Sequence, residues 1–117
     1  MQIAIIGAGK MAKAYISVAQ SLNFNIVGLH SRTFETAKSL SCTIGCKAYQ
    51  SIEELYNHTK ADIVINTCSE LAILKVCKEI FKYPWICLLE KPIGINHKES
   101  LEIKILAEDS GSKCFVA

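Results

Sequence analysis

The stretch IAIIGAGKMA, residues 3–12, decides the fold of this 117-residue chain. Its first four residues are apolar and mostly branched, which is typical of a strand buried on both faces of a parallel sheet. Two glycines then turn the chain, and Met11 and Ala12 begin a segment with helical spacing. The pattern Gly-x-Gly-x-x-Ala is one form of the turn that holds the diphosphate of a dinucleotide. Residues 3–12 therefore predict a strand, a phosphate-binding turn and the start of a helix.

The small residues of this turn have separate physical reasons. Gly7 permits the tight turn, and Gly9 has no Cβ, so a pyrophosphate can approach the backbone closely. Ala12 is small enough for the helix to pack against the strand. Free N–H groups and the helix dipole favour negative charge at a helix N-terminus. The candidate diphosphate-binding residues are Gly7, Ala8, Gly9, Lys10, Met11 and Ala12.

The following residues supply the context that this turn requires. Apolar residues recur at helical spacing and predict an amphipathic helix whose buried face carries Met11, Ala14, Tyr15, Val18, Ala19 and Leu22. Asn23 ends this helix, and residues 24–29 form a second apolar run that predicts a strand. Strand, glycine turn, helix and strand make a βαβ unit, which raises the glycine pattern from a chance turn to a predicted dinucleotide site.

Residues 30–33, HSRT, follow the second strand, about 20 residues after Gly7. An acidic side chain at this place would hold the ribose 2′-hydroxyl of NAD, but the first carboxylate is Glu35, inside the next helix. Ser31 and Arg32 offer a hydroxyl and a guanidinium instead, which suit an adenosine 2′-phosphate. We therefore expect NADP(H) to be favoured over NAD(H). The alternative is that both are ordinary loop residues and that the backbone alone holds the adenosine.

The rest of the chain continues to alternate strands and helices. Capping residues mark the helix ends, with Thr33, Ser51, Ser69 and Asn96 as expected N-caps and Gly111 as a C-cap. Residues 101–105 alternate like a strand, but the length and spacing of this segment favour a helix. The predicted helices cover residues 34–40, 52 onward, 70–81 and 97–110, and the further strands cover residues 47–49, 62–66, 85–89 and 114–116. This order predicts an α/β fold, a doubly wound parallel sheet of about six strands in a single domain.

Composition excludes several classes of function. A net charge of +2 with scattered lysines does not favour nucleic acid. No apolar run approaches the ~20 residues of a membrane span, and no basic and apolar leader precedes the first strand, so we expect a cytoplasmic location. The six cysteines contain no C-x-x-C pair and predict buried thiols in a reducing compartment, without disulfides or a metal site: Cys42, Cys46, Cys68, Cys77, Cys87 and Cys114.

A second motif lies at the end of the strand over residues 85–89. Glu90, Lys91 and Pro92 follow it, and together with the glycine turn they resemble the Gfo/Idh/MocA oxidoreductases over the whole chain. This resemblance implies a two-domain enzyme in which an N-terminal NAD(P)-binding Rossmann domain, here residues 1–117, precedes a substrate domain that this chain lacks. It implies hydride transfer between the nicotinamide and a sugar-like or other small hydroxyl or carbonyl compound.

The resemblance also assigns roles to residues. It places Thr67 and Cys68 in the small-residue loop beneath the cofactor, and Glu90, Lys91 and Pro92 beside its nicotinamide. Lys91 is the expected catalytic residue, which would hydrogen-bond the reacting oxygen and help to move its proton. A partly desolvated lysine beside oxidised nicotinamide holds its charged form less favourably, which suits that task.

Two features depart from the family pattern. Leu71, Ala72 and Ile73 stand where members often carry a histidine, and the Asn-Arg segment that would follow Ala117 is absent. We expect the isolated chain to bind nucleotide with little turnover, and its uncovered apolar surface allows self-association. One alternative is a stand-alone nucleotide-sensing or assembly module. Another is a Rossmann protein with a different ligand, such as an S-adenosylmethionine methyltransferase.

Overall fold

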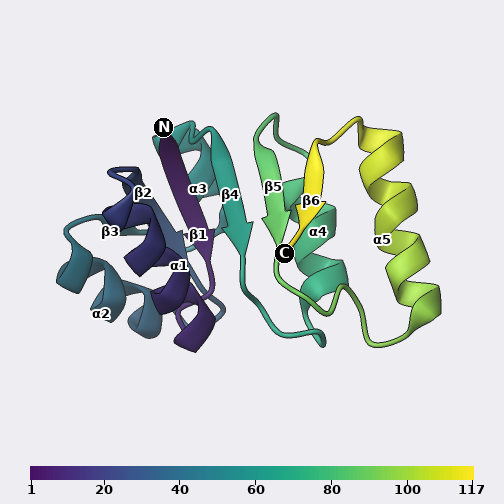
Figure 1. The fold of residues 1–117 in the computed structure, drawn as a ribbon, viewed down its shortest axis with the longest axis horizontal. Coiled ribbons are helices and arrows are strands. Elements are labelled where there is room, and N and C mark those ends of the chain that lie inside the picture. The colour runs from purple at the N-terminus through teal and green to yellow at the C-terminus, as the bar shows by residue number, and fades with distance from the viewer.

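A computed structural model describes all 117 residues and contains one six-stranded sheet with helices on both faces (Figure 1). All five strand pairings are parallel, and the strand order is β3-β2-β1-β4-β5-β6. The elements follow one another as β1 (Gln2–Ile6), α1 (Lys10–Ser21), β2 (Asn25–His30), α2 (Phe34–Ile44), β3 (Lys47–Ala48), α3 (Ile52–Thr59), β4 (Ile63–Asn66), α4 (Ile73–Ile80), β5 (Ile86–Leu89), α5 (His97–Ser110) and β6 (Cys114–Val116). The predicted doubly wound sheet is confirmed.

Strand β1 lies inside the sheet and is buried on both faces, as its sequence predicts. Ile3 and Ile5 belong to a core cluster with α1 and α2, whereas Ala4 and Ile6 belong to a second cluster with α3, α4 and α5. Because side chains alternate along a strand, one apolar run serves both cores. Every predicted strand boundary agrees with the structure to within one residue.

The predicted buried face of α1 is confirmed at Ala19, which is buried, and at Tyr15, which packs against the core, but it is wrong at its other positions. Met11, Val18 and Leu22 are exposed, with 44%, 56% and 56% of their surface accessible. The buried side chains of α1 are Ala19 and, outside the predicted face, Ala12 and Ile16. Two sets of apolar residues have helical spacing along α1, one containing Met11 and Val18 and the other containing Ala12 and Ala19. Their spacing alone does not show which set is buried. The short connection from β1 holds Ala12 against the sheet, and this contact turns the set containing Ala12 inward.

The predicted start of α4 is also wrong. Ser69 was expected as the N-cap, but the helix begins at Ile73, and Leu71 is 84% exposed. The Ser69 carbonyl accepts a hydrogen bond from the Ala72 N–H at 3.0 Å, so residues 69–72 form a single turn before the helix. Residues 67–72 therefore remain a loop beside the end of β4.

Local capping explains the helix boundaries that were predicted correctly. The Ser51 hydroxyl accepts the Glu54 N–H at 3.0 Å, and the Asn96 side chain accepts the Glu99 N–H at 2.9 Å. Residues 101–105 lie within α5, so this segment is a helix and not a strand, as predicted. The helix ends at Gly111, whose φ is 69°. Thr33 occupies the N-cap position of α2 without making a side-chain cap, and α2 runs on to Ile44, past its predicted end.

All six cysteines are free thiols in this structure, and Cys77 and Cys87 are buried in the core around α4 and β5. The prediction of buried thiols is wrong for Cys42, which is exposed, and the other three cysteines are half-buried. None of the helices combines the length and the apolar character needed to cross a bilayer.

Candidate functional site

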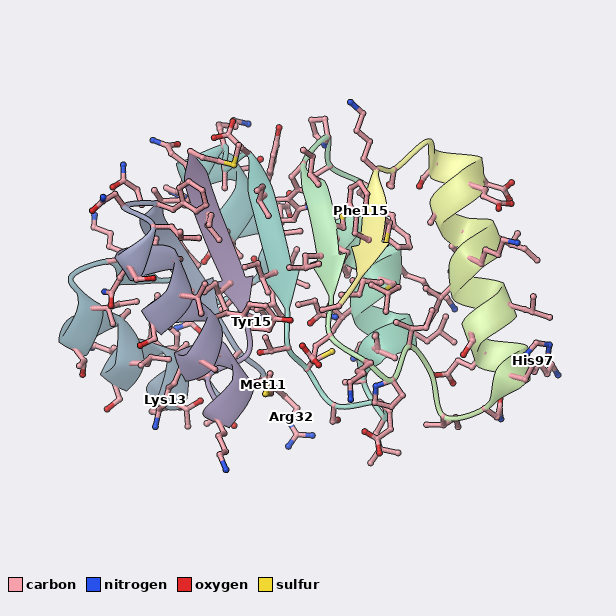
Figure 2. The ribbon with its side chains drawn as sticks, in the orientation of Figure 1. Met11, Lys13, Tyr15, Arg32, His97 and Phe115 are labelled. Carbon is pink, nitrogen blue, oxygen red and sulfur yellow. The ribbon has the colours of Figure 1, made fainter.

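The candidate site lies at the carboxyl ends of the parallel strands. The strand order reverses between β1 and β4, and in open α/β sheets this switch point forms the ligand crevice. The loops after β1, β2, β4 and β5 all start at this edge. Figure 2 shows Met11, Tyr15 and Arg32 gathered near the ends of β1 and β4. The fold thus brings the sequence-predicted residues to one edge of the sheet.

Gly7 begins the first of these loops, and its backbone is closely surrounded by other residues. Its φ is +107°, and a Cβ at this position would lie 2.1 Å from the Thr67 hydroxyl. The Gly7 N–H donates to the His30 carbonyl at 2.7 Å, which ties the turn to β2. The Thr67 hydroxyl and N–H both donate to the Ile6 carbonyl, at 2.9 and 2.8 Å. Thr67 therefore packs against the glycine turn and holds it to the end of β1.

Gly9 is open where Gly7 is crowded. It is the N-cap of α1 in extended backbone, with φ −90° and ψ −160°, and a Cβ here would meet no protein atom within 4 Å. No side chain caps this helix, and the first hydrogen bond into Gly9 comes from the Lys13 N–H. The N–H groups of Lys10, Met11 and Ala12 therefore have no acceptor within the protein. This arrangement fits a phosphate or diphosphate, which would supply the missing acceptors.

A cavity of about 410 Å³ adjoins this turn. It lies between the end of β2, the start of α3 and the first turns of α4, with Gly7 at one edge. Arg32 and Lys75 bring two cations to its wall, and Glu53 and Glu79 bring two carboxylates. The volume and the mixed polar lining suit a heterocyclic base with its sugar. Lys75, Glu53 and Glu79 were not predicted as site residues, because they lie on helices far along the chain.

Ser31 and Arg32 play different structural parts. Ser31 is only 8% exposed, and its hydroxyl donates to the Thr33 carbonyl at 2.6 Å, so it shapes its own loop. Arg32 is exposed, makes no ion pair within the protein and extends from the carboxyl edge of the sheet (Figure 2). The neighbouring His30 ring is fixed by a 2.9 Å contact between Nδ1 and the Tyr49 carbonyl. Arg32 is thus the side chain of this loop that is free to meet a ligand.

Asn66 ends β4 in the middle of the site. It is completely buried, its Oδ1 accepts the Cys68 N–H at 3.1 Å, and its Nδ2 has no partner in the protein. Cys68 lines the cavity, and burial raises the pKa of its thiol, so it stays neutral. Cys68 therefore offers a small apolar surface rather than a nucleophile.

Glu90 leads the loop after β5. Its N–H donates to the Asn66 carbonyl at 2.9 Å, and its Oε2 accepts the Tyr15 hydroxyl at 2.5 Å. Lys91 and Pro92 follow, joined by a cis peptide bond, and both are exposed. The exclusion of water that was expected around Lys91 is therefore not supplied by the residues of this chain.

A larger hollow of about 930 Å³ lies at the opposite edge of the sheet. Its walls include the C-terminal ends of α3, α4 and α5, at Lys60, Phe81 and Gly111. Lys60, Lys82 and Lys113 also line it, but it contains the carbonyl ends of three helices and no free helix N-terminus that could hold a diphosphate. The carboxyl edge of the sheet remains the better candidate for a dinucleotide.

Comparison with known proteins agrees with this placement. The family model GFO_IDH_MocA, described as an oxidoreductase family with an NAD-binding Rossmann fold, matches residues 1–117. The chain belongs to the Gfo/Idh/MocA oxidoreductase family. Membership confirms the resemblance inferred from the glycine turn and the Glu-Lys-Pro motif, and it removes the methyltransferase alternative. The chain is a Rossmann domain of the kind that binds NAD in this family.

Individual relatives are similar over nearly the whole chain. Glucose-6-phosphate 3-dehydrogenase of Bacillus subtilis is 30% identical over 110 residues, which are 92% of this chain and 30% of that protein. The WlbA dehydrogenase of Chromobacterium violaceum, solved with NADH and UDP-GlcNAcA, superposes with a TM-score of 0.89 at 19% identity, covering 100% of this chain and 34% of its own. A protein of Desulfitobacterium hafniense that was named as an NADPH-dependent oxidoreductase by inference superposes with a TM-score of 0.89 at 20% identity. The match covers 99% of this chain and 34% of that protein. The Gfo/Idh/MocA domain described here thus spans about a third of the length of these relatives.

Proposed function

We propose that this chain binds a nicotinamide dinucleotide across the crevice between β1 and β4, as the cofactor half of a dehydrogenase. The observation that carries the proposal is the uncapped start of α1. Three N–H groups without acceptors lie there beside Gly9, where a Cβ would meet only open space. Family membership supports the same ligand.

Each part of the dinucleotide has a place in this proposal. The diphosphate lies on the turn from Gly7 to Ala12, and the adenosine enters the cavity beside Arg32. The nicotinamide lies toward β4 and β5, because the two halves of a Rossmann sheet each take one mononucleotide. When bound, the cofactor would supply the hydride donor or acceptor, and Lys91 would hydrogen-bond the reacting oxygen and help to move its proton.

The substrate class comes from the relatives. Their names mention a sugar phosphate and a UDP-sugar, which supports a sugar-like or other small hydroxyl or carbonyl substrate. Because the chain spans about a third of these relatives, we propose that a separate substrate domain completes the site and that residues 1–117 alone turn over little. A stand-alone nucleotide-sensing module is the second candidate. The coding sequence beyond Ala117 distinguishes them: an in-frame substrate domain supports the enzyme, and a stop codon supports the module.

Arg32 gives a test of cofactor choice. We expect NADPH to raise the melting temperature of the chain more than NADH at equal concentration, because Arg32 is free to pair with the 2′-phosphate. Arg32→Ala should weaken NADPH binding about fivefold and leave NADH binding nearly unchanged, a loss of ~1 kcal/mol that suits an exposed ion pair.

Lys113→Ala is the matched control, since Lys113 is an exposed cation at the opposite edge of the sheet. An equal or larger shift with NADH in the wild-type chain would overturn the proposed NADP(H) preference. A wild-type chain that is stabilised by neither nucleotide would overturn the proposed function itself.

A further inference from the structure

Tyr15 makes a contact between distant parts of the chain. It lies in the second turn of α1, and its hydroxyl donates to the Glu90 carboxylate, 75 residues away in sequence. The helix that starts at the diphosphate turn is thereby joined directly to the loop after β5. Figure 2 shows Tyr15 beside the ends of β1 and β4, at the edge where the proposed cofactor lies.

The protonation state of Tyr15 makes it a permanent donor. Burial, and then its hydrogen bond to Glu90, raises the pKa of Tyr15 to about 12. The phenol therefore keeps its proton throughout the physiological range. A neutral hydroxyl that donates to a carboxylate forms one of the stronger hydrogen bonds available to a protein.

Glu90 is held at two points as a result. Its backbone N–H is bonded to the Asn66 carbonyl on β4, and its side chain is bonded to Tyr15 on α1. Lys91, the next residue, is exposed and makes no side-chain hydrogen bond or ion pair with the rest of the chain. The direction in which the chain leaves β5 is therefore determined at Glu90 and not by contacts of Lys91.

The contact also links the two halves of the cofactor site. Tyr15 follows the free N–H groups of residues 10–12 by about one helical turn, on the same rigid helix. Glu90 directly follows β5, in the half of the sheet that takes the nicotinamide mononucleotide in this proposal. A hydrogen bond between them sets the spacing between the diphosphate turn and the Glu90-Lys91-Pro92 loop.

We propose that Tyr15 is a positioning residue for the nicotinamide half of the site, acting through Glu90 on the loop that carries Lys91. Tyr15 does not touch the cofactor in this proposal, and its hydroxyl has no other partner. The inference rests on the proposed function, because it concerns how the same dinucleotide is held.

Tyr15→Phe tests the proposal, because phenylalanine keeps the ring and removes only the donor. We expect the affinity for NADPH to fall about five- to tenfold, the range of one hydrogen bond to a charged group when its loss is partly relieved by water. Affinity for adenosine 2′,5′-bisphosphate, which lacks the nicotinamide half, should change less than about twofold. Both affinities are measured by isothermal titration on the 117-residue chain.

Tyr56→Phe is the matched control. Tyr56 stacks on Tyr83 near the opposite edge of the sheet, its hydroxyl makes no hydrogen bond to the protein, and the variant should bind both ligands like the wild type. Equal losses for NADPH and the bisphosphate in Tyr15→Phe would overturn the inference, since a general weakening of the fold acts on both. Unchanged NADPH affinity would overturn it too.

A second variant tests the route through Glu90. Glu90→Gln retains an acceptor for the Tyr15 hydroxyl, so its NADPH affinity should fall less than that of Glu90→Ala. Adding Tyr15→Phe to Glu90→Ala should weaken binding no further, because the contact is already lost. Additive losses would show that Tyr15 acts elsewhere and would overturn the inference. A wild-type chain that binds neither ligand would overturn the proposed function, and this inference with it.

Discussion

Replacing Gly7 with alanine should destabilise the chain more than any other single methyl group added to the turn. The added Cβ would lie 2.1 Å from the Thr67 hydroxyl and 3.3 Å from the Thr67 backbone carbon, so the strain falls partly on the backbone. The φ of +107° adds strain of its own, because L side chains rarely adopt it. Together, overpacking and backbone strain should lower the free energy of unfolding by about 3 kcal/mol.

Urea denaturation followed by circular dichroism measures this loss. Gly45→Ala is the matched control, since Gly45 also has a positive φ, +80°, but a Cβ there meets no atom within 4 Å. The free energy of unfolding of the control should fall by only about 1 kcal/mol, because alanine there adds backbone strain but no overpacking. A Gly7→Ala variant no less stable than Gly45→Ala would show that the turn relaxes away from Thr67, which would contradict the support role of Thr67.

The turn at Gly7 was predictable because one short stretch of sequence carries its strand, its glycines and the start of its helix. Residues 3–12 carry their own strand pattern, turn and helix start, and the following βαβ order sets the sheet topology. Ala12 was likewise identified as a packing residue, and it is completely buried. These features depend on short stretches of sequence in which pattern and packing agree.

The features that the sequence did not predict depend on contacts between residues that lie far apart in the chain. The buried face of α1 was predicted only in part, because Met11 and Val18 have the same seven-residue spacing as Ala12 and Ala19, and only the contact of Ala12 with the sheet selects between the two pairs. The bond between Tyr15 and Glu90 joins residues 75 positions apart, which no local pattern reveals. Lys75 enters the cavity wall from α4 for the same reason.

The charge balance of the cavity also lay beyond the sequence. Arg32 and the lack of an acidic residue after β2 favoured NADP(H), yet Glu53 and Glu79 contribute carboxylates to the same wall. A phosphate there must therefore be held near Arg32 and away from these acids. The preference for NADP(H) depends on where the 2′-phosphate lies within the cavity, which is why Arg32→Ala is the variant that tests it.

Gly9→Ala should abolish most nucleotide binding while leaving the fold intact, the opposite of the expectation for Gly7. The backbone of Gly9 is extended, with φ −90°, and its Cβ would meet no protein atom. Alanine at an N-cap costs at most about 1 kcal/mol relative to glycine. The new methyl group, however, would occupy the space through which a diphosphate approaches the free N–H groups of Lys10 and Met11.

Losing one to two hydrogen bonds to a charged phosphate should weaken NADPH binding about 100-fold, or ~2.7 kcal/mol. Fluorescence titration with NADPH measures this loss, and urea denaturation of the same sample checks the fold. Gly45→Ala again serves as the control, because it should bind NADPH like the wild type although it is less stable. A Gly9→Ala chain that binds with wild-type affinity would show that the diphosphate does not approach the backbone there. The start of α1 would then no longer support the proposed function, because the open space at Gly9 and the free N–H groups beside it would serve no ligand.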